Sequence, residues 1–278
     1  MFRDFPNFSQ LNHVILCVPT ENDTIWLECT NQKIPFGFLG DFTNDRDVLL
    51  ITRNGGRFAH TPKYEARENL RAGLSEFSID STGTGRCESV TRFTGLQYDN
   101  LSSFLASGSD ERKKWLYANS SLPSIQISDF KVTETKERKP EVIIKESEVS
   151  KNYCSFSGNY LILPLNLVNA IDPVQKMVRR RLSPIVIHSS FFDSDTIIYN
   201  LPRNYKPDAL PKGTMINSGF GNYISSVAND GKKIIYTRQF ELREGRFNPE
   251  KYKEFYDFML QVSKADNTKI ILSKISGS

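Results

Sequence analysis

The sequence predicts a mainly β protein of the α+β class that ends in an amphipathic helix. Three observations support this prediction. Short runs of β-branched and aromatic residues recur along the chain, separated by Gly, Pro, Asn and Asp turn signals. Two such runs near the start, residues 12–19 and 24–30, flank a short polar turn. Residues 249–265, by contrast, repeat apolar side chains at helical spacing.

Composition narrows the class of protein further. The 278 residues are 38% hydrophobic and 12% aromatic, which is enough apolar material for a packed core. The net charge of +4 is a mild excess spread along the chain, so we expect no nucleic-acid partner. No apolar run reaches the roughly 18 residues of a membrane span, so none is expected. The first four residues are not followed by the apolar region of a signal peptide.

The four cysteines indicate free thiols rather than a metal site. Cys17, Cys29, Cys87 and Cys154 show no CxxC spacing, and the chain has only three histidines. A structural zinc site therefore lacks ligands at suitable spacing, and we expect no metal and no cofactor. Cys17 and Cys29 lie on the two runs of the first hairpin, where a disulfide would depend on the register. Buried free thiols are the favoured interpretation.

The first hairpin contains the candidate functional pair. A register with Cys17 opposite Thr24 places His13 directly opposite Glu28 on one face, with Cβ atoms about 4.5–5.5 Å apart. In that position a carboxylate holds an imidazole in one tautomer and stabilises its cation. A shift of one residue would put the two side chains on opposite faces of the hairpin. The alternative interpretation is a structural, hydrogen-bonded histidine and a solvated glutamate.

Sequence motifs in residues 8–64 resemble a known group of enzymes. The matching residues are Asn12-His13-Val14-Ile15, Val18-Pro19, Trp26-Leu27-Glu28-Cys29-Thr30, Pro35-Phe36-Gly37, residues 45–52, Gly55-Gly56 and Thr61-Pro62. They resemble the histidine and acid strands of transglutaminase-like thiol enzymes. The pattern is similar to a bacterial secreted family with an N-terminal β domain, a transglutaminase-like core and a C-terminal β domain. The resemblance is looser over residues 65–278.

The resemblance implies a function and a site. His13 matches the catalytic histidine, and Glu28 falls where the wider superfamily usually has Asp. In the family these groups serve papain-like acyl transfer or peptide hydrolysis, and complete members are exported. We therefore expect the His/acid-bearing part of such an enzyme, with a peptide or protein substrate and a periplasmic or otherwise extracytoplasmic location.

The family's nucleophilic cysteine has no counterpart in this match. In the family it opens a helix several tens of residues before the histidine, whereas twelve residues precede His13. We expect a C-terminal part that lacks the cysteine-bearing half, is inactive alone and self-associates through its exposed core sheet. Cys17 shares the His13 face but lies on a strand, without the helix dipole that lowers a thiol pKa. The alternative function is a non-enzymatic β-sandwich module with a binding or structural role.

The chain divides into two expected domains. Residues 1–64 hold the His/acid strands of a transglutaminase-like core and a second hairpin at residues 48–60, which turns at an Asn-Gly-Gly sequence. His60 ends this hairpin shortly before a proline, which favours a surface role. Residues 65–278 form a β-sandwich-like accessory domain with a helical insertion near residues 97–122.

Strands of the accessory domain are expected from alternation and turn signals. Residues 74–81 and 86–94 read as a hairpin around a Thr-Gly-Thr-Gly turn. Residues 142–145 are short and flanked by charge, which is typical of an edge strand or a hairpin strand. Further strands are expected at residues 125–128, 160–163, 196–199, 223–227, 233–242 and 269–272.

The predicted helix at residues 249–265 has a proline at its first position, where a missing N–H costs little. Its apolar residues recur every three or four positions, so one face should pack on the sheet. The side chains expected at that contact are Phe255, Tyr256 and Met259.

Overall fold

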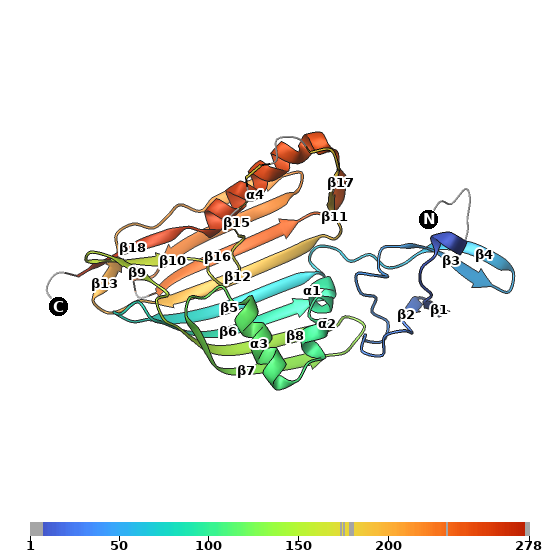
Figure 1. Cartoon of the computed structure of the whole chain (residues 1–278), viewed down its shortest axis with the longest axis horizontal. Coiled ribbons are helices and arrows are strands. Elements are labelled where there is room, and N and C mark those ends of the chain that lie inside the picture. The colour runs from blue at the N-terminus through green and yellow to red at the C-terminus, as the bar shows by residue number, and fades with distance from the viewer. Residues whose placement is uncertain (1–7, 173, 175, 178–180, 232, 276–278) are drawn as a thin grey trace.

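The computed structural model describes residues 8–172, 174, 176–177, 181–231 and 233–275. The start of the chain, where we expect no signal peptide, lies outside these residues. The protein is mainly β, as predicted, and its largest element is a mixed sheet in the order β14-β15-β16-β12-β5-β6-β8-β7 (Figure 1). The strands of this sheet are β5 (Leu70–Ile79), β6 (Gly85–Thr94), β7 (Ile125–Thr135), β8 (Glu141–Ser150), β12 (Phe191–Asn200), β14 (Thr214–Ser218), β15 (Gly221–Asn229) and β16 (Lys233–Leu242).

The large sheet consists of two antiparallel groups joined by one parallel pair. Strands β5, β6, β8 and β7 form one group, and β12, β16, β15 and β14 form the other. Between the groups, β12 and β5 run parallel, from Phe192 opposite Leu70 to Asn200 opposite Ser78. The sheet is therefore continuous only because this parallel pair connects its two halves.

Two predictions for this sheet have different outcomes. The hairpin at residues 74–81 and 86–94 is confirmed as β5 and β6. The strand predicted at residues 142–145 belongs to β8, which forms a hairpin with β7 as one alternative had it; the edge alternative is wrong, because β8 is longer and lies between β6 and β7. The carboxylates of Glu146 and Glu148 interrupt the apolar alternation of β8, so its second half did not resemble a strand of the sheet interior.

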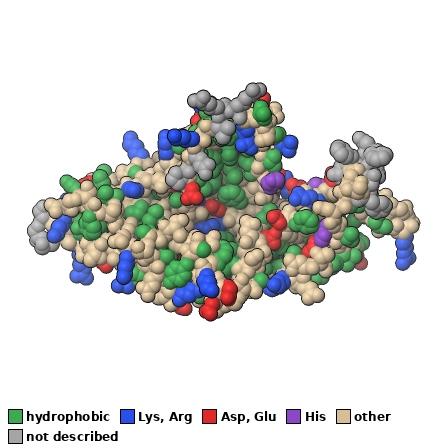
Figure 2. Space-filling model, viewed as in Figure 1, with side chains coloured by type: hydrophobic (Ala, Val, Ile, Leu, Met, Phe, Trp, Pro, Cys, Tyr) green, Lys and Arg blue, Asp and Glu red, His purple; other side chains and the backbone are tan. Residues whose placement is uncertain are grey.

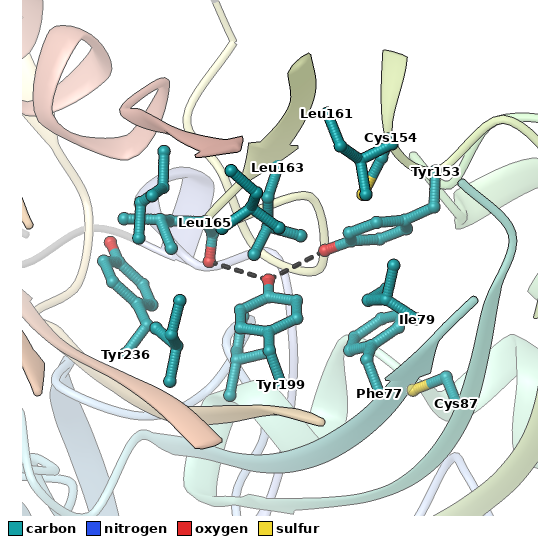
Figure 3. Close-up of a cluster of buried hydrophobic side chains, with 14 of the residues drawn as sticks. Phe77, Ile79, Cys87, Tyr153, Cys154, Leu161, Leu163, Leu165, Tyr199 and Tyr236 are labelled. Atoms are coloured by element: carbon teal, nitrogen blue, oxygen red, sulfur yellow. Dashed lines mark hydrogen bonds between the residues drawn. The ribbon is translucent and has the colours of Figure 1, made fainter. Parts of the chain in front are cut away.

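A second, four-stranded sheet packs against one face of the large sheet, in the order β13-β18-β10-β9. Leu161 of this sheet is buried with Phe77 and Tyr199 of the large sheet in a first hydrophobic cluster (Figure 3). Within that cluster the Tyr199 hydroxyl lies 2.8 Å from the Tyr153 hydroxyl and donates a hydrogen bond to the Leu165 carbonyl at 3.0 Å. The strands are β9 (Ser155–Ser157), β10 (Tyr160–Pro164), β13 (Tyr205–Pro207) and β18 (Lys269–Lys274).

Three short helices follow β6 at residues 95–119, in the region of the predicted helical insertion near residues 97–122. Phe104 and Leu116 from these helices pack with Ile144 of β8 in a second hydrophobic cluster. Across the described part of the chain, no helix is long and apolar enough to cross a membrane. The helices are α1 (Gly95–Asp99), α2 (Ser102–Leu105) and α3 (Ser109–Asn119).

The C-terminal segment forms the predicted helix. A 3-10 turn, Pro249–Lys251, leads into α4, Tyr252–Asp266. Phe258 is 2% exposed and Val262 is fully buried, and both pack with Phe240 of β16 in a third hydrophobic cluster. The amphipathic pattern therefore identified the helix and its docking on the sheet.

The predicted contact residues of α4 are partly wrong. Phe255 and Met259 are only partly buried at the margin of the third cluster. Tyr256 does not belong to it, and its ring lies 6.5 Å from that of Tyr252, one helical turn earlier. The deeply buried stripe instead includes Phe258, which the prediction left out.

The N-terminal residues form two hairpins beyond the right-hand end of the large sheet (Figure 1). In the first, β1 (Leu16–Pro19) pairs antiparallel with β2 (Thr24–Leu27). In the second, β3 (Asp47–Thr52) pairs antiparallel with β4 (Gly55–His60). The remaining short elements are η1 (Phe8–Gln10), β11 (Ile185–Ile187) and β17 (Gly245–Phe247).

The segment between the two hairpins packs on the helical insertion. Phe38 is 1% exposed and meets Tyr98 of α1 edge-on, with 5.9 Å between ring centroids. Arg138, between β7 and β8, forms an ion pair with Asp23 in the turn of the first hairpin. The domain boundary after residue 64 stays a prediction, and these contacts cross it.

All four cysteines are free. Cys87 and Cys154 are buried in the first hydrophobic cluster, and burial raises the pKa of the Cys154 thiol to about 12. On the first hairpin, Cys17 is half-buried and Cys29 is exposed. The expectation of buried thiols on that hairpin is therefore wrong for Cys29, which lies just past the end of β2.

Candidate functional site

His13 and Glu28 lie side by side at the open end of the first hairpin. The Nε2 atom of His13 is 2.7 Å from Oε2 of Glu28. Both residues lie just outside the regular strands, since β1 begins at Leu16 and β2 ends at Leu27. The structure thus brings the two predicted site residues together. Figure 2 shows the histidine side chains on the right-hand half of the molecule, where Figure 1 places this hairpin.

The register behind this contact differs from the predicted one. Cys17 pairs with Trp26 and not with Thr24, so the predicted register is wrong by two residues. Because side chains alternate with a period of two, this shift keeps His13 and Glu28 on the same face. The contact is therefore diagonal across the hairpin rather than between directly opposed residues.

Thr30 fixes the orientation of the Glu28 carboxylate. Its backbone N–H and its hydroxyl both donate to Glu28 Oε1, at 2.9 and 2.6 Å. Partial burial alone would raise the pKa of Glu28, but the hydrogen bonds from Thr30 and His13 outweigh it and hold the pKa below its usual value. Glu28 is therefore an ionised, oriented carboxylate with one oxygen for Thr30 and the other for His13.

The His13 ring has a hydrogen bond at one nitrogen and, among the described residues, none at the other. Its side chain is 21% exposed, and the Phe42 ring meets it edge-on at 5.1 Å between centroids. Among the described residues, no hydrogen bond occupies the Nδ1 atom. The arrangement can orient an imidazole and move a proton through Nδ1.

His60 is held between two carboxylates at the end of the second hairpin. Its Nδ1 atom lies 3.0 Å from Asp47 Oδ1, and its Nε2 atom lies 2.8 Å from Asp45 Oδ1. The hydrogen bonds to Asp47 and then Asp45 raise the pKa of His60. Both ring nitrogens are engaged, so His60 offers none to a reacting group.

No thiol completes the pair within the part of the chain that the structure describes. No hydrogen bond there joins His13 to a cysteine, and the exposed Cys29 thiol donates instead to the Leu27 carbonyl at 3.7 Å. The same residues contain no group of three or more His, Cys, Asp or Glu side chains suited to hold a metal ion. Among the described residues, the site therefore consists of an oriented imidazole and an ionised carboxylate.

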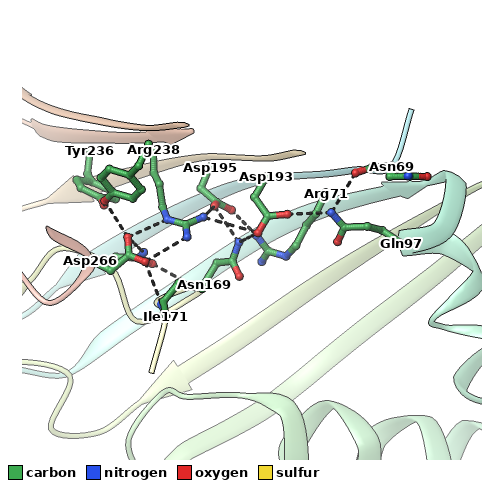
Figure 4. Close-up of polar contacts among 12 residues, drawn as sticks. Asn69, Arg71, Gln97, Asn169, Ile171, Asp193, Asp195, Tyr236, Arg238 and Asp266 are labelled. Carbon is green, nitrogen blue, oxygen red and sulfur yellow. Dashed lines mark hydrogen bonds and ion pairs between the residues drawn. The ribbon is translucent and has the colours of Figure 1, made fainter. Parts of the chain in front are cut away.

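The sequence prediction missed a buried polar network on the large sheet (Figure 4). Arg238 donates to both carboxylate oxygens of Asp266, at 2.8 and 3.1 Å, and to Asp195 at 3.2 Å. Asn169 donates to Asp193 and Asp195 at 3.0 and 3.1 Å. Two carboxylates at alternate positions of β12 were the available sequence signal, because such positions share one face.

Comparison with protein families matches residues 159–272 to a domain of unknown function, DUF3858. No curated protein matches the chain. Among solved structures, the chain is similar to one from Parabacteroides distasonis ATCC 8503 that is described as a candidate protease. The two share 7% identity over 74% of this chain and 99% of that one, with a TM-score of 0.36. A likeness at that level supports no argument about activity or site residues.

Proposed function

We propose that His13 and Glu28 form the histidine–carboxylate pair of a thiol-dependent acyl-transfer or peptidase site. The observation that supports this proposal is the 2.7 Å contact between His13 Nε2 and the ionised, Thr30-anchored Glu28. A carboxylate at Nε2 keeps a proton on that nitrogen and leaves Nδ1 as an acceptor. An acceptor nitrogen is what a thiol needs in order to lose its proton.

In the proposed reaction, the thiol comes from a segment or chain that packs against the first hairpin. Nδ1 of His13 takes the thiol proton, and the thiolate sulfur attacks the carbonyl carbon of an amide. The C–N bond then breaks as the imidazolium returns the proton to the leaving amine, and a thioester remains. Water or a second amine attacks the thioester and regenerates the thiol. Glu28 stabilises the imidazolium throughout.

Exposed apolar side chains near the pair support an external packing partner. Val14 is 81% exposed, Leu16 is 50% exposed and Phe42 is 55% exposed. Apolar side chains gathered at a surface are typical of contact sites. The proposal also includes a peptide or protein substrate, an extracytoplasmic location and a place in the C-terminal part of a transglutaminase-like protein. These three statements rest on the sequence resemblance.

The tautomer of His13 tests the role of the pair. Nitrogen-15 NMR of the purified chain should show neutral His13 with its proton on Nε2. Glu28→Gln should mix the two tautomers, because an amide both donates and accepts hydrogen bonds. His60 in the same spectrum is the internal reference. A proton on Nδ1 in the wild-type protein would sink the proposal, since that nitrogen then cannot accept one from a thiol.

Activity assays test the source of the nucleophile. The purified chain alone should show no amide hydrolysis and no amine incorporation, before or after thiol alkylation. Alkylation-sensitive turnover that also disappears in His13→Ala would place the nucleophile inside the chain, with Cys17 as the first candidate.

A non-enzymatic binding module is the second candidate function. The observation that favours it is a pocket with a polar floor and mainly apolar walls on the large sheet, far in sequence from His13. Ligand binding that persists in His13→Ala, together with no amide turnover in any preparation that contains a partner thiol, would favour the module.

A further inference from the structure

A pocket of about 230 Å³ lies over the large sheet between α3 and residues 167–169. Figure 1 shows α3 in front of the sheet on this side. Three polar side chains from adjacent strands cross the pocket floor in one row, because Ser75 pairs with Ser89 and Ser89 pairs with Glu146. The walls are mainly apolar and include Phe93, Trp115, Leu116, Leu167 and Val168.

The pocket floor separates the first and second hydrophobic clusters of the sheet. Between these apolar regions, Ser75, Ser89 and Thr91 are each more than nine-tenths buried although they are polar. Glu148, which also lines the pocket, is 8% exposed, and its Oε2 atom has no hydrogen-bond partner among the described residues. A buried carboxylate oxygen without a partner is unfavourable, because water solvates it in the unfolded chain. The pocket lining thus includes a carboxylate that the described residues leave short of hydrogen bonds.

The unbalanced charge in the pocket is negative. Arg71 lines it, but its guanidinium already forms an ion pair with Asp195. Glu146 and Glu148 form no ion pair within the described residues, and the lining residues from α3 and 167–169 are uncharged. Two carboxylates that share a confined site repel each other, and a cation between them relieves both.

The protonation of Glu148 reflects this environment. Burial raises the pKa of Glu148 to about 7, and the negative charges of Glu146 and Glu88 add to the effect. Burial also raises the pKa of Glu146, although Arg71 opposes that rise. Cys87 on the neighbouring strand also lies near this carboxylate, and burial keeps it a neutral thiol.

We propose that this pocket binds a small organic cation, an alkylammonium or alkylguanidinium group, whose N–H donors reach the carboxylates of Glu148 and Glu146. The apolar walls would enclose the alkyl stem, with Trp115 available to the cationic head or stem. A cavity of about 150 Å³ accommodates benzene, so this pocket is large enough for a cation of lysine or arginine side-chain size. The inference goes beyond the proposed thiol chemistry and does not depend on it.

Calorimetric titration with n-butylguanidinium tests the proposal at about pH 8, where Glu148 is ionised. Neutral n-butanol and anionic butyrate are the ligand controls of matched size. Binding of n-butylguanidinium should weaken at least about ten-fold in Glu148→Gln, because a charge-assisted hydrogen bond is lost. Glu76→Gln, which removes an exposed carboxylate on β5, is the matched protein control and should bind as the wild type does.

Two further measurements make the test decisive. Glu146→Gln, at a less buried position, should also weaken binding while the fold, followed by circular dichroism, stays intact. Nα-acetyl-arginine-methylamide is then compared with n-butylguanidinium. The probe that binds more tightly shows whether the pocket prefers a side chain within a polypeptide or a free small cation. Equal affinity of wild type and Glu148→Gln, equal affinity for butanol, or no saturable binding below about 10 mM would each overturn the proposal. The pocket would then hold water only.

Discussion

Arg238 and Asp266 meet in a two-point contact, with hydrogen bonds of 2.8 and 3.1 Å between side chains that are both fully buried. Asp266 is the last residue of α4, and Arg238 lies in β16. The same carboxylate accepts hydrogen bonds from the Tyr223 hydroxyl at 2.8 Å and from the Ile171 N–H at 2.9 Å. One side chain therefore joins the C-terminal helix, the large sheet and the segment that follows β10.

Removal of one partner from this contact should destabilise the fold strongly. Asp266→Asn leaves Arg238 buried with less compensating charge, and we expect the free energy of unfolding to fall by about 3–5 kcal/mol. Urea denaturation measures the loss. Asp257→Asn is the matched control, because Asp257 lies on the same helix and pairs with the exposed Lys253. That control should cost about 0.5 kcal/mol or less, and equal losses in the two variants would contradict the account.

The buried stripe of α4 predicts that replacing its aromatic side chains by Ala lowers the free energy of unfolding by different amounts. Phe258→Ala should cost about 3–5 kcal/mol, because Phe258 is 2% exposed within the third hydrophobic cluster. Tyr256→Ala, on the same helix but outside the cluster, should cost clearly less. Phe255→Ala should fall between them, since its ring contacts Phe220 at 5.1 Å between centroids but is only partly buried. Thermal unfolding of the three variants would test this order.

His60 predicts a dependence of local stability on pH. Its pKa is raised in the folded protein, so its contribution is fully present below about pH 6.5, the usual pKa of histidine, and is lost as the pH rises through the raised value. The imidazole proton resonances of His60 should therefore titrate above pH 6.5. In Asp47→Asn this midpoint should move down, because Asp47 supplies the largest favourable contact. A midpoint that does not move would contradict the assignment of the cause.

The raised pKa of Glu148 also predicts that stability depends on pH, but here the folded state favours the neutral form of the side chain. Its pKa rises from 4.5 to about 7 on folding, so between these values the folded state binds more protons than the unfolded state. Stability should therefore fall as the pH rises through this window, by about 3 kcal/mol at most. Glu148→Gln should remove that loss and be more stable than the wild type at about pH 8. Denaturation curves at both ends of the window measure the difference, and parallel pH profiles would contradict the prediction.

Local patterns predicted the elements of this fold better than their pairing. Alternation identified β5 and β6, and helical spacing identified α4, because both signals lie within a few consecutive residues. Alternation also fixed the shared face of His13 and Glu28, although the register was wrong by two residues. A two-residue shift leaves every side chain on its face, so the hydrophobic pattern cannot detect it.

The features that the sequence did not reveal depend on residues that are distant in the chain. Arg238 and Asp195 are brought together only when β12 and β16 pair, and no local pattern encodes that pairing. The length of β8 was underestimated because Glu146 and Glu148 occupy positions where apolar side chains are expected. Those departures from alternation coincide with the pocket, as is common where function conflicts with a local rule.

The parallel pairing of β5 with β12 determines whether the segment that matches DUF3858 can fold by itself. Residues 159–272 include β12 but not β5. Cut out alone, this segment would expose the backbone N–H and C=O groups of a long strand along one edge of its sheet. Such an edge recruits other strands, so the isolated segment should form intermolecular β-sheet or accept a donated strand. A protein that contains the segment therefore has to provide a substitute for β5, either from its own chain or from another.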